Sequence, residues 1–157
     1  MNLTLLLISF LTFNIFVFGI VYRKYGIRTS ISEGYYYLKS RTLFILWAWL
    51  TGIPIVILSD GSFFGWAAAG LLGFVGASGD ARSDDMTSGW HNIGAKGTVI
   101  AGWGLLIFTL GLWPLAVISF IGTFAMWKLK IKNDTWWIEV YVYYTIILGF
   151  VLRLYIL

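Results

Sequence analysis

The chain has 157 residues, of which 59% are hydrophobic and only 11% are charged, and its mean hydropathy is +0.83. Soluble domains carry about 25% charged residues, so this chain has too few charges to cover a surface that faces water. The composition excludes an ordinary soluble domain and predicts an all-α integral membrane protein. The absence of cysteine excludes disulfides and thiolate metal sites.

Six apolar segments follow one another along the chain. The hydrocarbon core of a bilayer is about 30 Å thick, a distance that about 20 helical residues cross. The predicted spans are residues 3-22, 43-59, 62-77, 94-112, 114-127 and 137-156. No basic segment precedes the first span and no small-residue cleavage site follows it, so we expect a retained helix rather than a signal peptide. No linker separates the spans, and residues 1-157 are expected to form a single bundle of six transmembrane helices.

A polar segment, residues 23-42, joins the first two spans. Ser30 and Glu33 have the spacing of a capping box, in which the serine hydroxyl and the glutamate each satisfy a free amide at the start of a helix. The three tyrosines that follow suit a short helix at the level of the lipid headgroups. This structural role is one interpretation of Ser32 and Glu33, and binding of a ligand is the alternative.

Small residues recur at every fourth position around the third span. They are Gly61, Gly65, Ala69, Gly73 and Ala77. On a helix they form a smooth stripe that lets another backbone approach closely. The stripe predicts either internal packing of the bundle or a homo-oligomer contact through Gly65, Ala69 and Gly73.

The basic residues predict the orientation of the bundle. Ten of the eleven Lys and Arg residues belong to the loops after the first, third and fifth spans or to their flanks, and only Arg153 lies toward the other face. The positive-inside rule places these three longer loops in the cytoplasm, with short outer hairpins and both termini outside (N-out/C-out). We therefore expect a multi-pass protein of the inner (plasma) membrane. Membrane orientation explains the net charge of +4 better than binding of nucleic acid does.

The longest polar run in the second half of the chain lies between the third and fourth predicted spans. Its residues Asp80, Asp84, Asp85 and His91 could bind a divalent cation. Carboxylates suit Mg²⁺, Ca²⁺ or Mn²⁺, and an imidazole beside them would suit Mn²⁺ or Zn²⁺. The spacing matches no closed metal motif, and a hydrated loop whose aspartates cap helices and pair with Arg82 is the alternative.

Glu139 lies about one turn inside the last predicted span. An ionisable residue within a span is a functional-site hypothesis by default. The alternatives are that the side chain extends to the headgroup level or pairs with Lys96.

The order of these motifs resembles a known group of proteins. A Ser-Ile-Ser-Glu33 segment follows the first helix, a tight hairpin comes next, and an acidic loop ends in His91-Asn-Ile-Gly-Ala95. This order resembles small bacterial multi-span proteins of the Frag/DRAM/Sfk type, although Glu33 stands where that family has aspartate. The resemblance implies lipid handling, and in eukaryotes the family is linked to the maturation of GPI anchors. A looser similarity to the CREST membrane hydrolases implies a zinc-dependent lipid hydrolase, but one histidine cannot supply their zinc site.

We predict a polar cleft that faces the cytoplasm, lies between the loops after the first and third spans, and binds a lipid or small amphiphile. The candidate ligand-binding residues are Ser32, Glu33, His91 and Glu139. One alternative is a small oligomeric channel or transporter, with a path lined by residues such as Thr51, Thr98 and Thr109. The other is a metal-dependent lipid hydrolase. Because no serine near His91 in the sequence has the spacing of a catalytic pair, we favour a binding protein over an enzyme.

Overall fold

The computed structural model describes residues 2–38, 40–77 and 85–155, and these residues form helices and short connections without a strand. The first helix is continuous through α1 (Leu3–Asn14), the π-helical η1 (Ile15–Tyr22) and α2 (Arg23–Tyr25). The next elements are α3 (Gly34–Tyr37), α4 (Arg41–Leu58), α5 (Phe63–Ala77), α6 (Asp85–Gly104), the π-helical η2 (Leu105–Thr109), α7 (Trp113–Lys128) and α8 (Asp134–Tyr155). The all-α fold class is therefore confirmed for this part of the chain.

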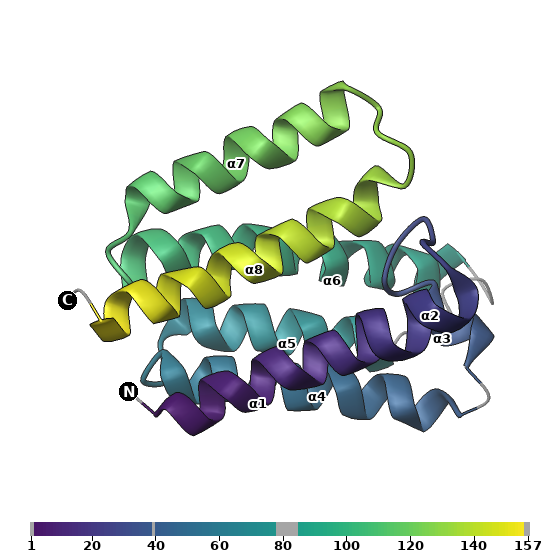
Figure 1. Cartoon of the computed structure of the whole chain (residues 1–157), viewed down its shortest axis with the longest axis horizontal. Helices are drawn as coiled ribbons and strands as arrows, with labels where there is room; N and C mark the ends of the chain where they lie inside the picture. The colour runs from purple at the N-terminus through teal and green to yellow at the C-terminus, as the bar shows by residue number, and fades with distance from the viewer. Residues whose placement is uncertain (1, 39, 78–84, 156–157) are drawn as a thin grey trace.

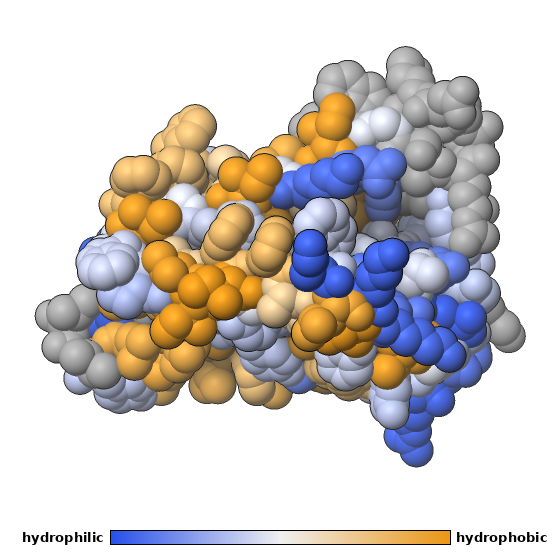
Figure 2. Space-filling view, turned by 90° about the horizontal axis from the view of Figure 1, so that it is seen from above, coloured by the Kyte–Doolittle hydropathy of each residue, from blue (hydrophilic) through white to orange (hydrophobic). Residues whose placement is uncertain are grey.

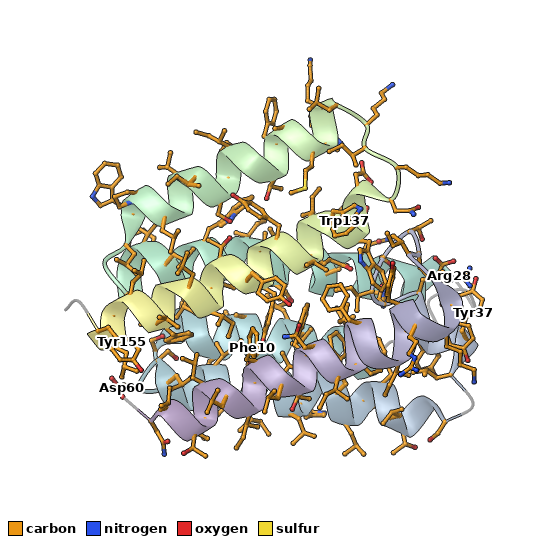
Figure 3. All side chains as sticks on the ribbon, in the orientation of Figure 1. Phe10, Arg28, Tyr37, Asp60, Trp137 and Tyr155 are labelled. Carbon is orange, nitrogen blue, oxygen red and sulfur yellow. The ribbon has the colours of Figure 1, made fainter. Side chains whose placement is uncertain are left out.

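The long helices lie side by side and run back and forth along one axis (Figure 1). Both termini lie at one end of this bundle, together with the turn between α4 and α5. The segment from α2 to α3 and the connection between α7 and α8 lie at the opposite end. Asp60 and Tyr155 mark the first end, and Arg28 and Tyr37 mark the second (Figure 3).

Two helices in the described part of the chain are long and apolar enough to cross a membrane, Leu3–Tyr25 and Asp134–Tyr155. Thr42–Leu58 and Phe63–Gly73 are also apolar but shorter. Each predicted span thus coincides with a helix over most of its length, whereas a bundle that crosses the membrane six times stays a prediction.

The helix that was expected to begin at residue 94 begins at Asp85. Hydropathy marks only the apolar part of a helix, and backbone hydrogen bonds extend α6 through the polar residues before it. The connection between α5 and α6 therefore has fewer residues than predicted. Residues 78–84, which include Asp80 and Asp84, lie outside the described part of the chain.

Aromatic rings fill the centre of the bundle, between α1, η1, α4 and α8. Phe13 stacks on Tyr143 with ring centroids 3.7 Å apart, and Phe16 stacks on Trp47 at 4.5 Å. Such pairs contribute about 0.5–1.5 kcal/mol beyond the burial of their area. Trp136, at the start of α8, is completely buried.

The stripe of small residues on α5 packs inside the chain, against α4 and the turn that joins the two helices. A Cβ atom added to Gly65 would overlap the hydroxyl of Ser59, and one added to Gly52 on α4 would lie 3.3 Å from the Cα of Ala69. Gly73 faces the ring of Trp49. The stripe therefore takes part in internal packing, and a homo-oligomer contact through it stays a prediction.

Large hydrophobic side chains cover much of the surface. Figure 2 shows them spread over most of the visible face, with hydrophilic residues gathered toward one end. Helix α7 is the extreme case, with six residues between 46% and 61% exposed: Val117, Ile118, Phe120, Ile121, Phe124 and Trp127. A continuous apolar surface of this kind marks contact with a partner or a membrane.

Candidate functional site

A cavity of about 80 Å³ lies inside the bundle, between α1, α4, α5, α6 and α8. Most of its wall is aliphatic or aromatic, and the polar residues that line it are Ser32, Thr51, Thr98, Glu139 and Tyr143. For comparison, a cavity of about 150 Å³ lined by apolar side chains holds a benzene molecule. The cavity thus has room for the end of an acyl chain or for a small polar group.

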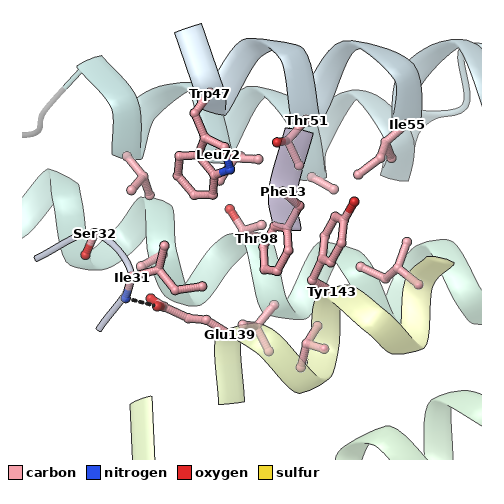
Figure 4. A pocket seen from close by; sticks show the side chains of 16 residues that line it. Phe13, Ile31, Ser32, Trp47, Thr51, Ile55, Leu72, Thr98, Glu139 and Tyr143 are labelled. Carbon is pink, nitrogen blue, oxygen red and sulfur yellow. Dashed lines mark hydrogen bonds between the residues drawn. The ribbon is translucent and has the colours of Figure 1, made fainter. Parts of the chain in front are cut away.

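Glu139 supplies an ionisable group of the cavity wall. Its Oε2 accepts a hydrogen bond from the backbone N–H of Ile31 at 2.6 Å (Figure 4). The predicted alternative partner, Lys96, is exposed on α6, and the carboxylate instead contacts the segment after α2. Because an ionised carboxylate in apolar surroundings is costly unless it is hydrogen-bonded, the Ile31 amide stabilises Glu139 in this position.

The segment between α2 and α3 forms a polar cap at one end of the cavity, and the start of α8 holds it there. The N–H of Trp136 donates to the carbonyl of Thr29 at 3.1 Å, two residues from the Ile31–Glu139 bond. Two backbone groups of the cap are thus bound to α8 within one short stretch. Sequence patterns gave no signal for these contacts, because they join segments more than a hundred residues apart.

Ser32 and His91, both singled out from the sequence, are in direct contact. The Oγ of Ser32 lies 2.8 Å from Nε2 of His91 at the start of α6. Ser32 is only 6% exposed and lines the cavity. Its hydroxyl also lies 3.0 Å from that of Ser30, which accepts the backbone N–H of Glu33 at 3.3 Å.

Glu33 has a local role in the structure. Its carboxylate accepts the backbone N–H of Thr29 at 3.0 Å and the hydroxyl of the same residue at 2.8 Å. The serine half of the predicted capping box is present, but the glutamate reaches Thr29 rather than Ser30. Glu33 therefore orders the cap, whereas Ser32 and Glu139 border the cavity.

Two further polar groups on the cavity wall have no hydrogen-bond partner in the described part of the chain. They are Nε1 of Trp47 and the hydroxyl of Thr51, on residues that are 5% and 1% exposed. Both lie on α4, across the cavity from Glu139 (Figure 4). A buried donor without a partner costs about 1–3 kcal/mol, so both groups favour an occupant that offers hydrogen-bond acceptors.

The threonines expected to line a pore do not share one site. Thr51 and Thr98 line the cavity, and Thr98 donates to the carbonyl of Gly94 at 2.8 Å. Thr109 lies apart from them, with its hydroxyl 3.1 Å from that of Ser62. Two of these three threonines thus line the cavity, and the third makes a separate polar contact elsewhere.

The predicted metal site falls largely outside the described residues. Asp80 and Asp84 lie in the stretch 78–84, and the structure describes only the backbone of Asp85. Within the described ranges, no three acidic or histidine side chains gather in a way that could hold a metal ion. The divalent cation stays a prediction.

Comparison with known proteins assigns no family. No family model matches the chain, and no curated protein or solved structure matches it either. The resemblance to the Frag/DRAM/Sfk type stays a prediction.

Proposed function

We propose that this chain is a multi-pass protein of the inner membrane that binds a lipid or small amphiphile in the cavity beneath the cap. The proposal depends on one observation: apolar and polar surroundings meet at this cavity. An apolar cavity inside the bundle borders Ser32, which contacts His91, and the carboxylate of Glu139. A molecule with one apolar and one polar end fits both environments at once.

Three features support the membrane part of the proposal. The helices alternate in direction (Figure 1), and α7 has an apolar exposed surface along most of its length. The connections at the end opposite the termini carry Arg23, Lys24, Arg28, Lys130 and Lys132. By the positive-inside rule this end faces the cytoplasm, and the chain crosses the membrane six times with both termini outside.

Selectivity of such a site must come from its polar groups. A buried CH₂ group contributes about 0.8 kcal/mol when it leaves water. An acyl chain that moves from the bilayer into the cavity gains little of this, because the bilayer interior is already apolar. Hydrogen bonds to Ser32, Thr51 or Trp47 distinguish the occupant from bulk lipid, since a buried hydrogen bond contributes about 0.5–1.5 kcal/mol net.

Native mass spectrometry of the purified chain in a mild detergent tests the proposal. We expect a monomer or dimer that carries one defined lipid or amphiphile mass per chain. Ala68→Leu should abolish this mass, because Ala68 is buried on the cavity wall and the larger side chain fills the space. Ala67→Leu is the matched control, since Ala67 is half-buried on the same helix outside the wall.

Two outcomes contradict the proposal. Ala68→Leu with the same bound mass as the parent would place the ligand elsewhere. A bare parent chain in a higher symmetric oligomer would favour the channel alternative and remove the cavity as the functional site.

A further inference from the structure

The contact between Ser32 and His91 has the geometry of a nucleophile and its general base. We infer that this pair cleaves acyl esters: Ser32 is the nucleophile, His91 is the base, and the substrate is an ester-bearing amphiphile whose apolar part occupies the cavity. The inference rests on the proposed function, because it takes the same occupant and the same cavity. It adds a reaction that binding alone does not require.

The distance is the first argument. A base that takes a proton from a serine lies about 2.6–3.2 Å from the hydroxyl oxygen, and Nε2 of His91 lies 2.8 Å from Oγ of Ser32. The second argument is position, because Ser32 lines the cavity and an ester group held there would lie beside its hydroxyl. None of the serines that neighbour His91 in sequence is needed for this pairing.

The hydrogen bonds around Ser32 are compatible with proton transfer from its hydroxyl to His91. Ser30 accepts the N–H of Glu33 at 3.3 Å, so its own hydrogen can point to Oγ of Ser32, 3.0 Å away. The single hydrogen of Ser32 then points to Nε2 of His91, in the tautomer that carries its proton on Nδ1. This arrangement leaves Nε2 as the acceptor that a general base requires.

Glu139 and Trp136 act as positioning residues for the nucleophile. The amide of Ile31, which precedes Ser32 directly, is bound to Glu139, and the carbonyl of Thr29 is bound to the N–H of Trp136. Both contacts hold the cap against α8 and so fix the backbone that directly precedes the reacting hydroxyl.

The proposed reaction balances with water as the co-reactant. Oγ of Ser32 forms a bond to the ester carbonyl carbon while Nε2 of His91 takes the hydroxyl proton. The tetrahedral intermediate then loses the alcohol, whose oxygen takes that proton from His91 as the ester C–O bond breaks. Water attacks the acyl-serine with His91 again as base, and the carboxylic acid leaves as Ser32 recovers its proton.

Covalent labelling tests the inference, since a merely structural hydrogen bond does not react with an electrophile. The probe is a fluorophosphonate with a short alkyl chain, chosen to fit the cavity and added in excess to the full chain in detergent. We expect one phosphonyl adduct in the tryptic peptide of residues 29–39, with fragmentation placing it on Ser32 rather than Ser30. We also expect a burst of nitrophenol from p-nitrophenyl butyrate.

The variants separate catalysis from structure. Ser32→Ala should remove the adduct, and His91→Gln should slow its formation about 10²–10⁴-fold, the usual contribution of a general base. Ser119→Ala is the control, because Ser119 is also buried but its hydroxyl accepts from Trp103 Nε1 at 3.1 Å. Each variant should keep the helix content of the parent by circular dichroism and elute from size exclusion at the same volume, which shows that it folds.

A parent chain that carries its amphiphile but forms no adduct on Ser32 would overturn ester cleavage and leave the binding proposal standing. A parent with neither the bound mass nor the adduct would overturn both. Labelling of His91→Gln at the parent's rate would show that Nε2 is not the base.

Discussion

The hydroxyl of Ser9 on α1 lies 3.0 Å from that of Tyr143 on α8 and donates to the carbonyl of Thr51 on α4 at 3.0 Å. Because a serine has a single hydroxyl hydrogen, which here goes to Thr51, the Tyr143 hydroxyl must be the donor to Ser9. One buried serine thus connects three helices beside the cavity.

This assignment predicts an asymmetry between two substitutions. Tyr143→Phe removes one donor but leaves Ser9 bonded to Thr51, so we expect a loss of about 0.5–1.5 kcal/mol of unfolding free energy. Ser9→Ala leaves the buried Tyr143 hydroxyl without its acceptor, and we expect about 1–3 kcal/mol. Reversible unfolding in mixed detergent micelles measures both, with Tyr155→Phe as an exposed control. Equal losses for the two variants would contradict the donor assignment.

Substitution of Gly65 tests the close packing between α4 and α5. A Cβ atom at this position meets the hydroxyl of Ser59, which is buried and donates to the carbonyl of Val56 at 2.9 Å. We expect Gly65→Ala to destabilise the chain by about 1–3 kcal/mol, the usual cost of overpacking. Gly70→Ala on the same helix meets open space and should be neutral or slightly stabilising. A Gly65→Ala variant as stable as the parent would show that the turn relaxes freely.

Hydropathy predicted most helix positions, because the apolar length of a helix is written in the sequence itself. The predicted span at residues 62-77 coincides with α5 (Phe63–Ala77). The start of α6 was wrong by nine residues, since polar residues continue a helix without any apolar signal. The small-residue stripe predicted close packing. The sequence alone does not say whether a neighbouring helix or a second copy of the chain packs against it.

Ser32, His91 and Glu139 were predicted from the sequence to lie around one cleft, but the contacts that these residues make were not predicted. Ser32, His91 and Glu139 each stood out for a local reason, either a motif or a charge inside an apolar run. Their contacts join positions 59 residues apart for Ser32 and His91 and 108 apart for Ile31 and Glu139, distances that no periodicity encodes. Trp47 was missed because the lack of a partner for its N–H among the described residues is a property of packing alone.

Glu139 is expected to hold the cap as well as to border the cavity. Glu139→Ala leaves the Ile31 amide without its acceptor, which should cost about 1–3 kcal/mol because a buried donor then lacks a partner. Glu139→Gln keeps an acceptor oxygen and should lose less than half of that. Limited trypsin digestion after Arg28 should accelerate in the same order, because a released cap exposes its backbone. Asp134→Asn is the control, since the Asp134 carboxylate binds only the neighbouring Thr135 among the described residues. If parent and Glu139→Ala were digested at the same rate, Glu139 would not position the cap.

The absence of cysteine makes the proposed topology directly measurable. Thr4 near the N-terminus and Lys132 between α7 and α8 are both exposed and are separated by five of the six proposed crossings, so they should face opposite sides of the membrane. In right-side-out vesicles, a membrane-impermeant maleimide should react at once with the Thr4→Cys variant. It should react with Lys132→Cys only after permeabilisation, because the basic connection faces the cytoplasm. The reverse pattern would invert the orientation, and immediate labelling of both variants would contradict an odd number of crossings between them.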